Sequence, residues 1–516
     1  MTKSTVYVLI PLSLIVSVFI VSRGVPQTFR GHEEVQLLEP VTVENEDGTA
    51  TVVDKQIVPL GPAASQISIK QLGTNGGGFY GVNSAHPLEN PDPWSNLFEM
   101  ISLLLIPAAL CFTFGRNIKD KKQGVAVFLA MFIMLALALA VTLIRPKSGW
   151  SYYENRNLAH PAELSVETLL DGTFPASVEP VLQDHAAGRN TLMKLSVWVD
   201  LHLFHRPVVN QVVPADGMLL GWNPYETPDP AGITAQAEHM AEELARLRDV
   251  VEGYGGRFCY AAVPGQYAYY PEAYPDFLNN REAYTALEVP ALTHAMAERG
   301  MDLLDMGPVL DTAGNPREYY SMADYHYQFG GAYLTYRAIL ERLSAELGTE
   351  LTILDGNSLA VETLPNPYLG SRGRKLFGLE DCGEHLTIGL PRAPVPFTRT
   401  DNDTETAPTV YALPATGTEG VLYSLYMGGD VGETVIETNR PDLPSILIYG
   451  DSFTNPVECL AYYSFDEMRS IDLRHYREMP LADYIRLHQP DIVVGIRDYE
   501  ALLSTDYNGS PFSVQP

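Results

Sequence analysis

The sequence predicts an α/β domain with mostly parallel strands, preceded by a membrane region of three helices. The apolar residues crowd into the first 145 of 516 positions, where they form three long segments. After Ser148, short apolar segments typical of buried strands alternate with segments of helical periodicity. Strands that alternate with helices indicate a sheet with mostly parallel strands. We therefore expect two regions of different character in one chain.

The membrane region is expected over residues 1–145. Its three apolar segments are Val6–Ser22, Leu97–Phe114 and Val125–Ile144. The last has about twenty residues without a charge, the length that a bilayer core requires. The first segment could instead be a cleaved signal peptide, but no clear small-x-small cleavage site follows it.

Basic residues predict the orientation of these segments. The short loop between the second and third segments carries Arg116, Lys119, Lys121 and Lys122. Loops rich in Lys and Arg stay on the cytoplasmic side. The third segment then leads outward, so everything after about Arg145 is expected to be extracytoplasmic in a multi-pass protein of the cell membrane. Lys3 at the inner terminus agrees with this topology.

The remaining chain reads as one α/β domain with an insertion. The clearest helical segments are Thr191–Phe204, Thr234–Glu252, Pro290–Arg299 and Gly331–Leu347, and the clearest strands are Phe258–Val263, Ser445–Tyr449 and Ile492–Ile496. Residues 385–440 are rich in Thr, Gly and Pro and have β character. We interpret them as a β-rich insertion that divides the domain into residues 148–384 and 441–516.

Charge and cysteine content exclude some classes of function. The formal net charge is −29, which would repel the phosphates of a nucleic acid. A neutral or cationic partner, such as a glycan or a metal ion, fits better. The four cysteines, Cys111, Cys259, Cys382 and Cys459, are too few for a disulfide scaffold.

A glycine-rich segment has the composition of a potassium-selectivity loop. Thr74 and Asn75 precede Gly76, Gly77 and Gly78. Such a loop replaces the water shell of potassium with backbone carbonyls, and glycine permits the required backbone angles without a side chain in the way. The alternative is a flexible turn between two helices.

A second constellation has the residue types of nucleophilic catalysis. Ser452 lies in Gly450–Phe453, directly after the apolar strand Ser445–Tyr449, where α/β proteins bind ligands. Asp324 and His326 are two residues apart, so an extended backbone would place both side chains on one face. A base and an orienting carboxylate could activate the serine. Alternatively, the serine belongs to an ordinary turn, and the Asp–His pair caps the helix that begins near Gly331.

The first region resembles part of the potassium-binding subunit of the Kdp-type potassium-transporting ATPase. The matching segments are Tyr7–Leu14, Gly24–Phe29, Pro59–Pro62, Gln71–Phe79, Asn83–Pro91 and Ile106–Arg116. The resemblance implies potassium at the loop and other transporter subunits as partners. However, that family builds one filter from four pore loops, and this chain has one. It also lacks a phosphate-binding loop and an Asp-Lys-Thr-Gly motif. Four copies around an axis could in principle rebuild a filter.

The second region resembles the DHHW family, relatives of the SGNH-hydrolase-like O-acetyltransferases of bacterial exopolysaccharides. The matching segments are Tyr153–Ala159, Asp184–Arg189, Asn210–Gly217, Asp324–Tyr333, Gly450–Phe453 and Ile471–Tyr476. The resemblance implies a three-layer SGNH-like fold, catalysis by Ser452, His326 and Asp324, and an acetyl donor supplied by a membrane-bound O-acyltransferase. The name motif reads Asp324-Tyr325-His326-Tyr327 here, so substrate detail differs. Arg474 and Tyr476 match a family block that would bind substrate or simply pack.

These observations leave three functions open. The leading one is a membrane-anchored O-acetyltransferase or acetylesterase that acts on a cell-surface polysaccharide, with no cofactor beyond potassium at the filter-like loop. The second is a component of a potassium-transport system, and the third is a non-catalytic glycan-binding domain. The junction near Ile144–Ser148 would then be a gene fusion or a join made in sequence assembly.

Overall fold

The computed structural model describes most of the chain in two compact units. The described residues are 4–44, 50–74, 78–81, 84, 86–143, 150–154, 156–170, 173–185, 188–224, 227–278 and 281–505. The first unit comprises residues 1–150 and 157–189, and the second comprises 151–156 and 190–516. Residues 157–189, which the sequence placed in the soluble domain, therefore pack with the first unit.

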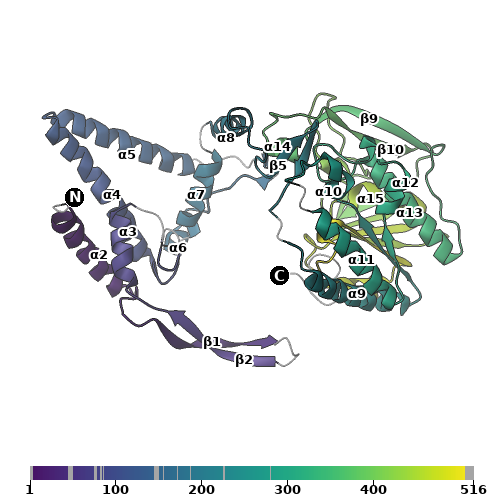
Figure 1. The fold of residues 1–516 in the computed structure, drawn as a ribbon, viewed down its shortest axis with the longest axis horizontal. Helices are drawn as coiled ribbons and strands as arrows, with labels where there is room; N and C mark the ends of the chain where they lie inside the picture. Colours follow the sequence, from purple (N-terminus) through teal and green to yellow (C-terminus); the bar gives the residue numbers. More distant parts are fainter. Residues whose placement is uncertain are drawn as a thin grey trace. The chain divides into compact units, whose positions relative to one another are not determined.

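The first unit is built mainly from helices (Figure 1). They are a π-helical turn η1 (Thr5–Leu9), α2 (Ile10–Ser22), α3 (Ala63–Leu72), α4 (Pro93–Asn117), α5 (Lys121–Leu143), α6 (Val166–Leu170) and α7 (Thr173–His185). The strands β1 (His32–Glu44) and β2 (Ala50–Pro59) form an antiparallel pair between α2 and α3. Each of the three expected apolar segments is thus helical over nearly all of its length.

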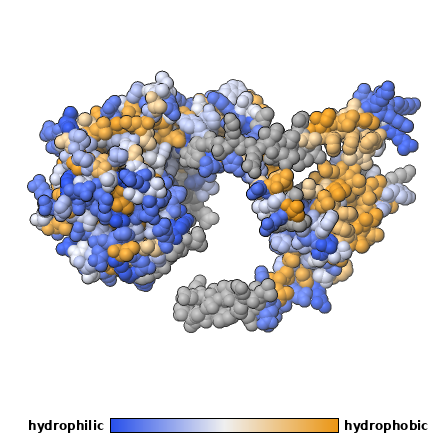
Figure 2. All heavy atoms as spheres, turned by 180° about the vertical axis from the view of Figure 1, so that it is seen from behind, coloured by the Kyte–Doolittle hydropathy of each residue, from blue (hydrophilic) through white to orange (hydrophobic). Residues whose placement is uncertain are grey.

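Two helical segments of the described residues have the length and apolarity that a membrane span requires, Thr5–Ser22 and Pro93–Asn117. Their outward side chains are apolar, as at Leu14 (65 % exposed) and Leu110 (58 % exposed). Figure 2 shows hydrophobic residues gathered on the helices of this unit. Such exposed apolar surface would be costly in water and suits lipid. The first unit therefore has a surface suited to association with a membrane.

An eight-stranded mixed sheet forms the centre of the second unit. Its order is β12-β11-β13-β15-β14-β16-β7-β8. The bounds are β7 (Arg257–Val263), β8 (Leu303–Asp305), β11 (Thr398–Asp401), β12 (Thr404–Thr406), β13 (Glu433–Glu437), β14 (Ile446–Gly450), β15 (Glu467–Asp472) and β16 (Ile492–Asp498). The five strands from β15 to β8 are parallel.

The expected insertion is largely part of this sheet. Strand β13 pairs antiparallel with β15, and β11 and β12 continue the sheet outward. Ile436 on β13 is completely buried, which shows that the added strands share the main core. The composition of residues 385–440 suggested a separate insertion, because Thr, Gly and Pro also mark the turns between short antiparallel strands.

The second unit also contains helices, some of which pack on the sheet. They are α8 (Arg189–Trp198) with the π-turn η3 (Val199–Leu203), α9 (Pro230–Glu252), α10 (Gln266–Tyr269), α11 (Glu282–Glu298), α12 (Gly307–Thr312), α13 (Phe329–Leu347), α14 (Gly370–Lys375), α15 (Asn455–Ala461) and α16 (Leu481–His488). Helix α9 contacts both α11 and α16, while α13 and α15 form a second contacting pair. The helix expected at Pro290–Arg299 begins eight residues earlier, with Pro290 inside α11.

Five short one-turn elements and two small ribbons complete the second unit. The turns are η4 (Pro271–Ala273), η5 (Arg317–Tyr319), η6 (Tyr423–Leu425), η7 (Tyr462–Ser464) and η8 (Tyr499–Ala501). The ribbons are β5 (Val212–Ala215) with β6 (Met218–Gly221) and β9 (Leu359–Tyr368) with β10 (Glu384–Pro391). The strands β3 (Trp150–Ser151) and β4 (Arg156–Asn157) pair where the two units join along the chain.

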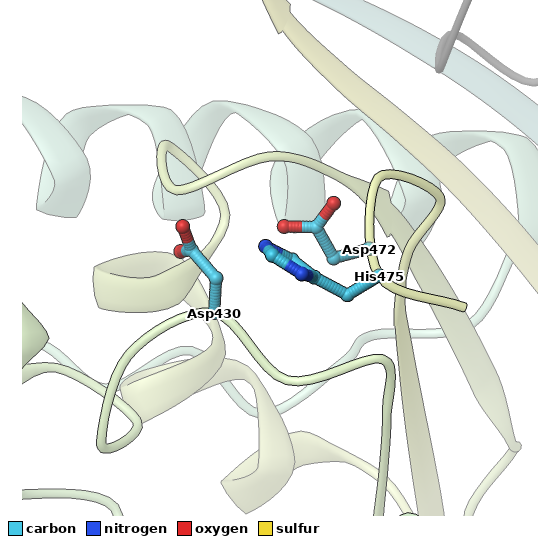
Figure 3. A group of neighbouring side chains, drawn as sticks. All are labelled: Asp430, Asp472 and His475. Atoms are coloured by element: carbon cyan, nitrogen blue, oxygen red, sulfur yellow. The ribbon is translucent and has the colours of Figure 1, made fainter. Parts of the chain in front are cut away.

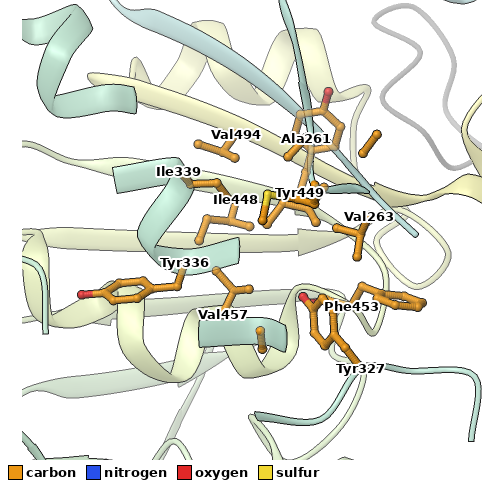
Figure 4. Packing of buried hydrophobic residues seen from close by; sticks show 14 of the residues in the cluster. Ala261, Val263, Tyr327, Tyr336, Ile339, Ile448, Tyr449, Phe453, Val457 and Val494 are labelled. Carbon is orange, nitrogen blue, oxygen red and sulfur yellow. The ribbon is translucent and has the colours of Figure 1, made fainter. Parts of the chain in front are cut away.

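The core beneath the end of β14 is closely packed (Figure 4). Tyr336 and Ile339 of α13 and Val457 of α15 meet Ile448 on β14, and all four are buried. Phe453, just after β14, is 1 % exposed and lies edge to face with Tyr327 at 5.1 Å between ring centroids. Ser452, the residue before Phe453, is therefore attached to a closely packed part of the core.

Candidate active site

Ser452 lies in a tight turn at the carboxyl end of β14. The strand ends at Gly450, where a Cβ atom would lie 2.4 Å from the carbonyl oxygen of Ile496 on β16, so only glycine fits. Asp451 then closes the turn, because its Oδ1 accepts a hydrogen bond from the backbone N–H of Phe453 at 2.9 Å. Helix α15 begins at Asn455, three residues after Ser452. The carboxyl edge of parallel strands is where α/β proteins place reactive groups.

Asp324 and His326 lie in a loop that joins η5 to α13. The loop is closed by a bridge between Tyr320 and Tyr327 and by a hydrogen bond from Ser321 N–H to the His326 carbonyl at 3.2 Å. Tyr327 is 1 % exposed, and its hydroxyl donates to the carbonyl of Phe453. This bond ties the loop directly to the turn that carries Ser452.

The three side chains form one hydrogen-bonded chain. His326 Nε2 lies 2.7 Å from Ser452 Oγ, across 126 residues of sequence. His326 Nδ1 lies 3.0 Å from Asp324 Oδ1. The residues are 6 %, 4 % and 1 % exposed for Ser452, His326 and Asp324. Neither Asp324 nor His326 caps α13, whose N-cap is Gln328 without a side-chain bond, so the helix-capping alternative is wrong.

Asp324 is strongly held in its ionised form. Although burial alone would raise its pKa, the charge and hydrogen bond of His326, together with Tyr368 and Ser371, hold the pKa far below its usual range. Tyr368 donates its hydroxyl to Asp324 Oδ2 at 2.6 Å, and the Ser371 N–H donates to the same oxygen at 2.7 Å. A carboxylate with this many donors keeps its charge and fixes its own orientation.

The imidazole of His326 is clamped between aromatic rings. Tyr423 stacks on it almost parallel, with 3.8 Å between ring centroids and 5° between the planes. Tyr325 lies against it at 3.8 Å and 35°, and Phe453 at 5.1 Å. Stacking on this scale limits rotation of the ring and keeps Nε2 directed at Ser452.

Glu384 holds the loop that carries Asp324 and His326 through hydrogen bonds. The sequence interpretation missed this role. The Glu384 carboxylate accepts hydrogen bonds from Ser321 Oγ at 2.6 Å, Met322 N–H at 2.7 Å and Ala323 N–H at 3.0 Å. Gln328 Nε2 adds a longer bond at 3.3 Å. Burial raises the pKa of Glu384. Strand alternation could have signalled this residue, because it shares the inward face of β10 with Leu386 and Ile388.

The strands β9 and β10 carry both supports of the loop. Glu384 at the start of β10 is paired in register with Tyr368 at the end of β9. The next turn requires Gly370, which has φ 68° and would place a Cβ 2.2 Å from the Ala323 carbonyl oxygen. Its backbone therefore passes close enough for Ser371 N–H to reach Asp324.

Arg474 and Tyr476 have partners other than Ser452, His326 and Asp324. Arg474 Nη2 lies 2.5 Å from Asp472 and 3.0 Å from Asp430, and these carboxylates raise the pKa of the guanidinium. Tyr476 is 7 % exposed and meets Tyr484 edge to face at 5.6 Å. The structure thus joins Ser452, His326 and Asp324 to one another, and it joins Arg474 to carboxylates.

One group of side chains in the described residues has spacing suited to a metal ion. It comprises Asp430, Asp472 and His475, whose potential ligand atoms all lie within 4.8 Å of one another (Figure 3). The guanidinium of Arg474 forms ion pairs with both carboxylates. Asp430 and Asp472 thus belong to an ion-pair network with Arg474.

The filter-like segment is described only at its ends. Asn75, Gly76 and Gly77 lie outside the described residues. Thr74 has φ 54°, and a Cβ at Gly78 would lie 1.5 Å from the Gly81 carbonyl oxygen, so a side chain there is excluded. After the glycines, Glu89 Oε1 accepts the N–H groups of Tyr80 at 2.6 Å and Gly81 at 3.3 Å.

A buried ion pair holds Glu89 in place. Lys70 Nζ on α3 lies 2.7 Å from Glu89 Oε2, and the Glu89 side chain is completely buried. Lys70 also donates to Ser84 Oγ at 2.8 Å. The bonds from Lys70, Tyr80 and Gly81 outweigh the effect of burial and lower the pKa of Glu89. The glycine-rich segment is thus followed by a fixed turn.

The two units match two different families. Residues 1–167 match the potassium-transporting ATPase A subunit, and residues 221–409 match the family described as SGNH hydrolase-like domain, acetyltransferase AlgX. The second match includes Asp324 and His326 and ends before Ser452. Both resemblances drawn from the sequence are confirmed, as is an SGNH-like α/β fold behind a membrane region.

Relatives of the first unit are close in sequence. The potassium-binding subunit of the potassium-transporting ATPase is 64 % identical over 148 residues in Clostridium botulinum (strain Alaska E43 / Type E3) and 59 % identical over 149 residues in Clostridium perfringens. Each match covers 29 % of this chain and 25 % of the relative. The chain therefore spans about a quarter of the length of these curated relatives.

Solved structures resemble the second unit more distantly. Bacillus cereus PatB1 has a TM-score of 0.49 and 18 % identity, with 58 % of this chain and 99 % of that chain covered. A DHHW family protein from Eubacterium siraeum DSM 15702 has a TM-score of 0.43 and 20 % identity, with 58 % and 95 % covered.

Proposed function

We propose that the second unit is a serine-dependent O-acetyltransferase or acetylesterase that acts on a cell-surface polysaccharide. The observation that carries this proposal is the hydrogen-bonded chain from Ser452 Oγ through His326 to Asp324. The match of residues 221–409 to an acetyltransferase family supports it. The net charge of −29 favours an uncharged polymer such as a glycan over a polyanion.

The proposed reaction proceeds in two acyl-transfer steps. Ser452 Oγ attacks the carbonyl carbon of an acetyl ester, and its proton passes to His326 Nε2. The tetrahedral intermediate collapses, the leaving oxygen takes that proton, and an acetyl-serine remains. A sugar hydroxyl or water then attacks this ester, with His326 as base, and Ser452 is regenerated. Asp324 stays ionised throughout and stabilises the imidazolium, since its pKa is held far below neutrality.

The backbone N–H of Ser452 is placed to stabilise the oxyanion. It donates no hydrogen bond to any residue in the described part of the chain. A free amide at the carboxyl end of a strand is a common donor in such sites. Arg474 and Tyr476 are proposed to contact the substrate only at the margin, since Arg474 is bound by two carboxylates.

We propose that the first unit anchors this enzyme in the cell membrane with the second unit outside the cell. The exposed apolar helices and the basic segment around Arg116 and Lys122 support this orientation. A membrane-bound O-acyltransferase would then supply the acetyl group. A cysteine placed at the exposed Ser504 tests the orientation, because an impermeant thiol reagent should label it in right-side-out vesicles and spare it in inverted ones.

The decisive experiment is ester hydrolysis by the full-length chain in detergent. With p-nitrophenyl acetate, Ser452→Ala and His326→Ala should each lower kcat/KM by at least ~10³-fold. Ser504→Ala is the matched control, because this serine is exposed, and it should retain wild-type activity. Activity that survives Ser452→Ala contradicts the proposal. Glycan binding without any acetyl transfer would instead favour a non-catalytic domain.

A second candidate function is potassium binding within an ATP-driven transport system, with other transporter subunits as partners. The identity of 64 % to a potassium-binding subunit favours it. Thr74–Gly78 would contribute one loop of a filter that needs several. The test is growth at low potassium of a strain that lacks its own potassium-binding subunit. Growth restored by this chain would establish transport, and failure would leave the anchoring role.

A further inference from the structure

The helical segment formed by α8 and η3 has apolar side chains on two opposite sides. On its inner side, Val197 is buried and packs with Met193 and Leu201 in a small core of the second unit. On its outer side, which we call the outer face, five large apolar side chains are between 45 % and 65 % exposed: Leu192, Leu195, Trp198, Leu203 and Phe204. A surface helix of a soluble domain normally keeps its outward side polar. The fold of the second unit therefore does not explain the outer face.

The outer face continues through the change from α-helix to π-helix. Leu192, Leu195 and Trp198 are three residues apart, which places them along one side of α8. In η3 a hydrogen bond joins residues five apart, from the Phe204 N–H to the Val199 carbonyl at 3.0 Å. The step of five residues from Trp198 to Leu203 is thus close to one turn of this wider helix. The wider turn returns Leu203 to the side that carries Trp198.

The charges beside the outer face are opposite in balance to those of the whole chain. Residues 189–206 contain the basic residues Arg189, Lys194 and Arg206, and their one acidic residue is Asp200. The whole chain has 34 Lys and Arg against 63 Asp and Glu. Asp200 is itself paired with Arg206 at 3.2 Å. Leu, Trp and Phe on one face with basic residues beside them are typical of a helix that lies in a membrane interface, where anionic headgroups attract the cations.

We propose that the outer face of α8 and η3 is a membrane-binding surface that takes the anionic interface of a lipid bilayer. The order of elements along the chain favours lipid as the occupant. Helix α5 ends at Leu143, and α8 begins at Arg189, so the segment follows a unit whose own surface suits a membrane. The inference goes beyond the proposed acyl transfer and does not depend on it, because neither Ser452 nor its partners take part.

The inner side of the segment connects it to the loop that carries Asp324 and His326. Val197 belongs to the same small core as Ala323, the residue before Asp324. Phe377, two residues after α14, completes this contact from the other side of the chain. A bilayer bound to the outer face therefore restrains a helix that shares its core with the catalytic loop.

Fluorescence quenching by brominated phospholipid tests the surface in the full-length chain. The chain is reconstituted in vesicles of phosphatidylcholine and phosphatidylglycerol, and subtracting each Trp→Phe variant from wild type isolates one tryptophan. Trp198 should lose at least about half of its emission when the acyl chains are brominated, because side chains of an interfacial helix reach about 5–10 Å into the bilayer. Trp222, half-buried against the main core of the second unit, is the matched control and should keep its emission. Trp94, at the start of α4, is the positive reference.

Charge reversal tests the anionic headgroups. Lys194→Glu combined with Arg206→Glu should lower the quenching of Trp198 by about twofold or more in vesicles that contain phosphatidylglycerol. Arg246→Glu combined with Arg337→Glu is the matched control, because both side chains are exposed on other helices, and it should leave the quenching unchanged. Equal quenching in the two double variants would contradict binding to anionic headgroups.

The remaining outcomes separate this inference from the proposed function. Trp198 emission that brominated lipid does not change, while Trp94 is quenched, overturns the inference and assigns the outer face to a protein, either a second copy or another subunit. Absence of ester hydrolysis in wild type removes the proposed function, whereas quenching of Trp198 in the same preparation supports the membrane-binding surface on its own.

Discussion

Two loops of this protein are each held by one buried glutamate, and the two glutamates differ in charge balance. In the first unit, Glu89 accepts the N–H groups of Tyr80 and Gly81 and forms an ion pair with Lys70. In the second unit, Glu384 accepts Ser321, Met322 and Ala323. The described residues place no cation in an ion pair with Glu384.

The difference appears in the direction of each pKa. The pKa of Glu89 is lowered, because Lys70 and the two N–H groups more than compensate for burial. The pKa of Glu384 is raised, because the hydrogen bonds from its neutral donors do not compensate for burial. Each glutamate supplies the acceptor that the backbone N–H groups of a buried loop require. The comparison teaches that hydrogen bonds fix the loop in both cases, while the cation decides how the loop responds to pH.

The largest effect should come from removing the acceptor in the second unit. Glu384→Ala leaves Met322 N–H, Ala323 N–H and Ser321 Oγ buried without a partner, which we expect to cost about 4 kcal/mol of unfolding free energy. Glu384→Gln keeps one acceptor oxygen and should cost about half as much. Hydrogen exchange of residues 321–328 in the full-length chain measures the loss of stability in both variants. Protection that is unchanged in Glu384→Ala would show that the loop does not depend on this carboxylate.

A comparable loss is expected when only the cation of the first unit is removed. Lys70→Met leaves the buried Glu89 charge unpaired, which should cost about 3 kcal/mol. The double variant Lys70→Met with Glu89→Gln removes both charges and should recover most of that loss. Thermal unfolding in detergent gives the values. A double variant no more stable than Lys70→Met would mean that the charge pair is not the relevant interaction.

The two glutamates should give opposite pH dependence. Glu384 binds its proton more tightly in the folded state, so its contribution to stability is complete below its ordinary pKa of 4.5 and declines as pH rises through the raised value. Glu89 contributes above pH 4.5 and loses that contribution as pH falls through its lowered pKa. Subtracting the unfolding profile of Glu384→Gln or Glu89→Gln from wild type isolates each slope. Slopes of the same sign would contradict the comparison.

The smallest effect is expected from an exposed ion pair that holds no loop. Arg337 and Glu341 on α13 lie 2.6 Å apart, with side chains 45 % and 52 % exposed. Glu341→Ala should change the unfolding free energy by less than ~0.5 kcal/mol, because solvent screens such pairs. It therefore controls for the loss of a carboxylate as such. A loss as large as that of Lys70→Met would mean that burial is not what distinguishes the two loops.

Much of the architecture follows from local pattern. The strand Ser445–Tyr449 and the helix Gly331–Leu347 were predicted within a few residues, because buried strands and amphipathic helices repeat with short periods. Helix α11 was cut short, since Pro290 resembles a helix start although the helix tolerates it inside. Strands β11–β13 were assigned to a separate insertion, because pairing partners distant in sequence leave no periodic signal.

The sequence by itself determined the two families, the apolar segments, and the residue types Ser452, His326 and Asp324, because each depends on a short motif or a local period. Only the tertiary structure decided that Ser452 meets His326 across 126 residues, that Tyr368 and Glu384 support the loop from one ribbon, and that Arg474 is bound by Asp430 and Asp472. Such contacts depend on strand order and register. Those are set by packing of the whole core, which no single segment encodes.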